Sequence, residues 1–90
     1  MVAGVSEPAQ ARSAVLRSLR EAEAYTESLA SLRLRVGDAI SAVSAEIGGT
    51  ATRADRQVMT ELGAAWAELD GLIGGVRRAV VEGRRYAESL

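Results

Sequence analysis

The chain has no cysteine, histidine, lysine or phenylalanine, and only one proline in 90 residues. Without cysteine or histidine, the usual zinc sites, thiol nucleophiles and histidine-based acid–base pairs are excluded. The Glu-x-x-His pairs of di-iron and di-manganese helical bundles are excluded for the same reason. We therefore expect a protein that is not an enzyme and that binds no metal or cofactor.

An excess of charge of either sign is also lacking, because 11 arginines and 12 acidic residues give a formal net charge of −1. Proteins that bind nucleic acid by electrostatics normally show a basic excess. No apolar run reaches 18 residues, so we expect no membrane span. Since the first residues lack a basic stretch followed by an apolar one, we expect either a cytoplasmic protein or export by a route independent of a signal peptide.

The residues that are present favour helices. Apolar residues make up 48% of the chain and charged residues 26%, while aromatic residues make up only 3%. Alanine dominates the apolar set, and alanine and leucine are strong helix formers. A length of 90 residues fits one domain, so residues 1–90 are expected to form a single all-α unit.

The first long helix is expected over residues 7–47. Ser6 or Glu7 provides its N-cap, with Pro8 in the first turn, where a missing N–H costs nothing. From residue 19, apolar side chains recur at an average spacing of 3.5 residues, which is typical of a heptad seam. The positions are Leu19, Ala22, Tyr25, Leu29, Leu32, Val36, Ile40, Val43 and Ile47.

A turn over residues 48–51 and a second helix over residues 52–89 follow. The Gly48-Gly49-Thr50 segment suits a helix end, and Thr52 with Asp55 has the spacing of a capping box. The second helix repeats the heptad pattern. Its apolar positions are Val58, Leu62, Ala65 with Trp66, Leu69, Leu72 with Ile73, Val76, Val80, Gly83, and Tyr86 with Ala87.

The short turn requires the two helices to lie antiparallel, as a long helical hairpin. A register in which paired positions sum to about 98 matches five apolar pairs. These are Val36 with Leu62, Leu32 with Trp66, Leu29 with Leu69, Tyr25 with Ile73, and Ala22 with Val76. The residues predicted to hold the hairpin together are Leu29, Leu32, Val36, Leu62, Trp66, Leu69, Ile73 and Val76.

The chain has more apolar residues than one seam uses, which predicts a second hairpin packed on the first as a four-helix bundle. Small residues four apart on the second helix form a ridge that would allow a partner helix to approach closely. This predicted partner interface consists of Gly63, Ala67, Gly71 and Gly75. The alternatives are an exposed face that tolerates glycine and a kink near Gly74-Gly75.

Charged residues offer two further interpretations. The acidic residues Glu21, Glu23, Glu27, Glu68 and Asp70 are typical of a solvated helix surface, not of a catalytic pair. The basic cluster of Arg77, Arg78, Arg84 and Arg85 suits the C-terminal part of a helix. It also leaves open a nucleic-acid-associated or regulatory bundle. A third alternative is a structural or chaperone-like coiled coil that binds an amphipathic helix.

The layout resembles the early-secreted-antigen (WXG) family of type VII secretion substrates in actinobacteria and firmicutes. A cysteine-free chain of this length with a central turn is similar to that family. The second half of the chain is also similar to the family's second helix, on the segment Leu62-Gly63-Ala64-Ala65-Trp66-Ala67-Glu68-Leu69 and on Leu72, Val76 and a late Tyr86. The resemblance implies a dimer in which the protein partner is a second copy or a paralogous hairpin.

The chain departs from that family at two motifs. Gly48-Gly49-Thr50 stands where the family has its Trp-x-Gly turn. Leu90 stands four residues after Tyr86, where the family's export signal has an acidic residue. If the chain is exported, the resemblance implies that a partner supplies that signal.

Overall fold

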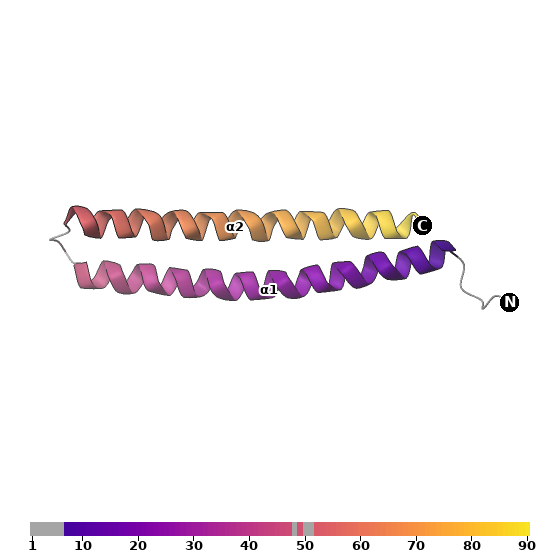
Figure 1. The fold of residues 1–90 in the computed structure, drawn as a ribbon, viewed down its shortest axis with the longest axis horizontal. Coiled ribbons are helices and arrows are strands. Elements are labelled where there is room, and N and C mark those ends of the chain that lie inside the picture. The colour runs from indigo at the N-terminus through magenta and orange to yellow at the C-terminus, as the bar shows by residue number, and fades with distance from the viewer. Residues whose placement is uncertain (1–6, 48, 50–51) are drawn as a thin grey trace.

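The computed structural model describes residues 7–47, 49 and 52–90. Two helices, α1 (Glu7–Ile47) and α2 (Arg53–Glu88), run side by side in opposite directions (Figure 1). The described residues form no strand. The all-α helical hairpin expected from the sequence is therefore confirmed, and both helices end within one residue of the expected bounds.

The start of α2 is fixed by the capping box that the sequence predicted. The backbone N–H of Asp55 donates to the Thr52 hydroxyl at 3.1 Å, and the Thr52 N–H donates to the Asp55 carboxylate at 2.8 Å. At the other terminus of the hairpin, Glu7 and Pro8 lie in the first turn of α1. Gly49 lies in a turn, whereas the proposed cap Ser6 and the turn residues 48, 50 and 51 lie outside the described residues.

The hairpin is a single long layer. Its radius of gyration is 20.6 Å and its principal extents are 74 × 16 × 14 Å. A compact domain of 90 residues has a radius of gyration of about 12 Å. A rod of this kind leaves every residue within one helix diameter of solvent, so little of the chain is buried.

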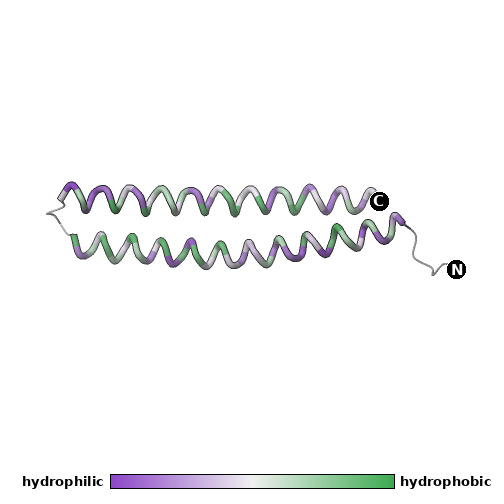
Figure 2. The backbone as a smooth tube through the Cα atoms, viewed as in Figure 1, coloured by the Kyte–Doolittle hydropathy of each residue, from purple (hydrophilic) through white to green (hydrophobic). Residues whose placement is uncertain are grey.

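Apolar residues recur along both helices (Figure 2). The positions at which the helices face each other repeat every seven residues on each helix. Among the described residues, the only buried hydrophobic side chains are Ile73, Val80 and Ala87, which lie seven residues apart on α2. On α1 the corresponding series contains one buried residue, Thr26, whose hydroxyl donates to the carbonyl of Ala22 at 2.9 Å. Here "the seam" means the series Leu19, Thr26, Arg33, Ile40 and Ile47 on α1, and Met59, Trp66, Ile73, Val80 and Ala87 on α2.

The expected register between the helices is wrong by five residues, which is about 1.4 helical turns. Arg33 pairs with Asp70, and the Trp66 ring lies beside Gly37, so both contacts join positions that sum to 103. The expected sum of about 98 had Leu32 opposite Trp66. In addition, α1 turns the residue after Leu32 toward α2, so Arg33 takes the place at the interface that was expected for Leu32.

Candidate functional site

One side of the hairpin is identified by a hollow beside Thr26 and Val80. Glu27 and Val81, which directly follow these two seam residues, both line it, together with Glu23, Arg77 and Arg84. Residues that follow the seam therefore lie on the same side of both helices. We call this side the polar face.

Residues that directly precede the seam must then share the opposite side, because neighbouring residues on a helix are about 100° apart. On α1 this series contains Tyr25, Leu32 and Ala39. On α2 every member is apolar: Val58, Ala65, Leu72, Ala79 and Tyr86. On each helix, a further row of residues lies between this series and the seam. The apolar residues of this row are half-buried. We call this side the apolar face; its half-buried row is Val15, Ala22, Leu29, Val36 and Val43 on α1, and Leu62, Leu69, Val76, Gly83 and Leu90 on α2.

Large hydrophobic side chains remain exposed mainly on the apolar face. Tyr25, Leu32, Val58, Leu72 and Tyr86 are all exposed there. Trp66 is partly exposed within the seam, and Leu34 and Val81 are exposed on the polar face. Scattered exposed apolar residues are normal in proteins. Five large ones on the same face form a patch of the kind that marks contact surfaces.

The ion pairs that join the two helices flank the polar face. Arg84 forms an ion pair with Glu23, and Arg33 forms one with Asp70 at 2.5 Å. The Arg33 guanidinium also lies 5.7 Å from the centroid of the Trp66 ring, within cation–π range. Arg33 thus occupies a seam position because both its charge and its planar group have partners on α2.

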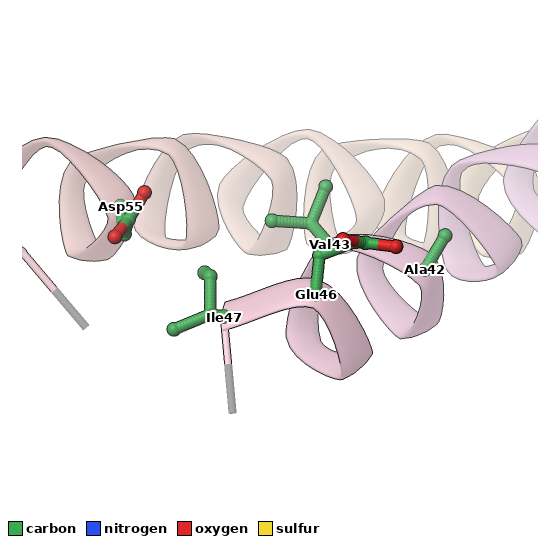
Figure 3. A pocket seen from close by; sticks show the side chains of 5 residues that line it. All are labelled: Ala42, Val43, Glu46, Ile47 and Asp55. Atoms are coloured by element: carbon green, nitrogen blue, oxygen red, sulfur yellow. The ribbon is translucent and has the colours of Figure 1, made fainter. Parts of the chain in front are cut away.

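At the turn end of the apolar face, a shallow hollow lies between the end of α1 and the start of α2. Figure 3 shows Ile47, Val43 and Glu46 on one side of it and Asp55 on the other. The hydrogen bond from the Thr52 backbone N–H lowers the pKa of the Asp55 carboxyl, and the Thr52 hydroxyl lowers that pKa further. Asp55 is therefore an ionised helix cap, not a general acid.

The described residues hold no group of three or more histidine, cysteine, aspartate or glutamate side chains placed to bind a metal ion. In the same part of the chain, neither helix has a stretch that is long and apolar enough to cross a membrane.

The residues expected to hold the hairpin together are distributed over three rows. Ile73 is fully buried in the seam, and Trp66 also lies in the seam but is partly exposed. Leu32 is exposed, because Arg33 takes the position expected for it. The remaining five lie in the half-buried row of the apolar face: Leu29, Val36, Leu62, Leu69 and Val76.

The ridge of small residues lies on the outer surface of α2. Gly63, Ala67 and Gly71 are exposed and Gly75 is half-exposed. A Cβ added at Gly63 or Gly71 would meet no atom within 4 Å. The ridge therefore makes no close contact with α1 at these two glycines.

The arginine cluster does not form one basic surface. Arg84 is paired with Glu23 across the helices, and Arg85 is paired with Glu82 at 3.0 Å on α2 itself. The guanidinium of Arg78 lies near the backbone of Gly74.

The feature that the sequence did not predict is the separation of the two faces. The polar residues Thr26 and Arg33 in the seam were the signal that could have indicated it. The chain matches no protein-family model, no curated protein and no solved structure.

Proposed function

We propose that this chain is a non-enzymatic protein–protein interaction module whose hairpin forms one layer of a larger helical bundle. The observation that carries the proposal is the shortage of internal burial. Among the described residues, three hydrophobic side chains are buried while eight large ones are exposed. Since burial of apolar area is the main stabilising term in folding, such a layer gains most of its stability from a second layer.

The resemblance to type VII secretion substrates supports the same proposal, because those proteins act as homo- or heterodimeric four-helix bundles. The partner in this proposal is a second helical hairpin, either the same chain or a paralogous one. The nucleic-acid alternative has less support, because two of its four arginines already pair with glutamates within the hairpin.

The proposal is tested by the stability of the isolated chain at high dilution. We expect helical signal in circular dichroism that is lost at low denaturant, with a free energy of unfolding below about 3 kcal/mol, under the range of about 5–15 kcal/mol of typical domains. The fit should be made at concentrations where light scattering gives the mass of one chain. A dilute monomer that unfolds cooperatively with more than about 5 kcal/mol would show that one layer suffices, and the proposal would then fail.

A further inference from the structure

We propose that the apolar face docks against the same face of a second copy of this chain. The inference rests on the proposed function and names both the surface and the partner. The two helices pack on each other through the seam and part of the half-buried row, where Gly83 lies against Leu19. The hairpin leaves the large side chains of the next series exposed to solvent, namely Tyr25, Leu32, Val58, Leu72 and Tyr86.

The apolar face is continuous along most of both helices. From Val15 to Val43 on α1, and from Val58 to Leu90 on α2, its two rows contain no charged residue. Charge appears only at the turn end, at Glu46 and Asp55. The centres of protein interfaces are depleted of charge in the same way, with polar residues confined to the edge.

The spacing on this face matches that of a packing seam. On α2 its members follow one another at alternating steps of four and three residues from Val58 to Leu90. Steps of this kind keep side chains along one stripe and allow them to interdigitate with a neighbouring helix. The face therefore has the pattern of a second seam parallel to the one inside the hairpin.

The absence of charge favours a second copy as the occupant. A two-fold symmetric interface sets a surface against itself, so any charged residue near its centre meets a like charge. The apolar face avoids this repulsion, because its charge-free rows run from near the open end to within one turn of Ile47. The polar face, which presents Glu27, Arg77 and Arg84, offers no such neutral stripe.

The exposed area also fits a partner of equal length. The accessible surface of the chain is 6561 Å². A compact monomer of 9.4 kDa exposes about 5,000 Å², so the whole chain, counted over all its sides, exposes roughly 1,500 Å² in excess. That excess is about twice the 800 Å² that one partner buries in a standard interface, and it lies in the range of permanent homodimers. A short peptide helix would cover only part of a face of this length.

The test compares two double variants that carry the same change on opposite faces. Leu32→Glu with Leu72→Glu places charges on the apolar face, where the side chains are 45% and 51% exposed. Leu34→Glu with Val81→Glu places charges on the polar face, where the side chains are 68% and 49% exposed. Light scattering over about 1–500 µM should show dimers for the wild type and the polar-face variant, with self-association at least 100-fold weaker for the apolar-face variant.

A second measurement avoids variants that disturb folding. Because the chain has no cysteine, Leu72→Cys and Val81→Cys each introduce a single thiol on one face. We expect the thiol on the apolar face to react with iodoacetamide at least tenfold more slowly at high protein concentration than at low. The thiol on the polar face should react at the same rate at both concentrations.

Two results would overturn the inference. If charges on the polar face dissociate the dimer and charges on the apolar face do not, the surface is wrong although the proposed function stands. If the wild type stays monomeric to about 500 µM, the partner is not a second copy. In that case the dilution measurement of the proposed function separates a hairpin that needs another partner from one that needs none.

Discussion

The two faces of the hairpin differ although they are built from neighbouring residues. Leu32 and Leu34 are two positions apart, yet one joins a charge-free surface and the other stands beside ion pairs. On α2, Leu72 precedes the buried Ile73, whereas Gly74 follows it. A shift of one residue relative to the seam thus separates a surface suited to contact from a solvated one.

The difference shows which face has interactions within the chain and which face leaves large apolar side chains exposed. On the polar face, Glu23 and Asp70 have arginine partners on the other helix, so these two charges are paired within the chain. On the apolar face, the large side chains of Tyr25, Leu32, Val58, Leu72 and Tyr86 stay exposed. Composition alone does not reveal this division, because the apolar content is spread over both helices.

The largest effect is expected at the residue that underlies both faces. Ile73→Ala removes the only large, fully buried side chain of the described residues and should lower the free energy of unfolding by about 2–5 kcal/mol. Leu34→Ala on the polar face is the control and should change it by less than about 0.5 kcal/mol. Denaturant titration at one fixed concentration measures both. Equal losses would mean that Ile73 does not carry the seam.

A smaller effect is expected at the charged end of the apolar face. Thr52→Ala removes the helix cap and should cost about 1 kcal/mol. Because the pKa of Asp55 is lowered in the folded state, its ionised cap stabilises the fold above the ordinary pKa of 3.8 and is lost as the pH falls through the lower folded value.

Stability of the wild type should therefore fall on acidification below that ordinary pKa, and Thr52→Ala should weaken this dependence. Thermal melts between pH 2 and pH 6, with Thr60→Ala as a matched control within α2, measure the difference. An unchanged pH dependence in Thr52→Ala would show that the Thr52 hydroxyl does not contribute to the lowered pKa of Asp55.

The smallest effects are expected at two glycines that differ in their surroundings. Gly71→Ala on the outer surface meets open space and should raise the free energy of unfolding by about 0.5–1 kcal/mol. Gly83→Ala would bring a Cβ to within 2.7 Å of the Leu19 side chain, so it should lower stability by about 1 kcal/mol. A gain at both positions, measured by chemical denaturation, would mean that α1 and α2 do not approach closely at Gly83.

Much of the fold could be predicted because its signals are local. The capping pair Thr52 and Asp55 fixes the start of α2 by hydrogen bonds between residues three apart. The heptad spacing of apolar residues and a glycine-containing turn are enough to indicate two antiparallel helices. Each of these features depends only on residues close in the sequence.

The choice of seam could not be predicted in the same way. On α1, Leu29 and Val36 belong equally to a stripe with Tyr25 and Leu32 and to one with Thr26 and Arg33. Hydropathy favours the first stripe, but the structure uses the second. Arg33 can occupy the seam because it forms an ion pair with Asp70 and a cation–π contact with Trp66. These two partners are 37 and 33 positions away in the sequence. Such long-range compensation has no local signature.

The hairpin has two unlike poles. The start of α1 and the end of the chain lie at one pole, and Gly49 lies at the other (Figure 1). With α2 of 36 residues between them, the poles are about 54 Å apart. A fluorophore attached at Gly49 therefore reports the direction in which two hairpins pack together, while a protein fused after Leu90 projects from the opposite pole.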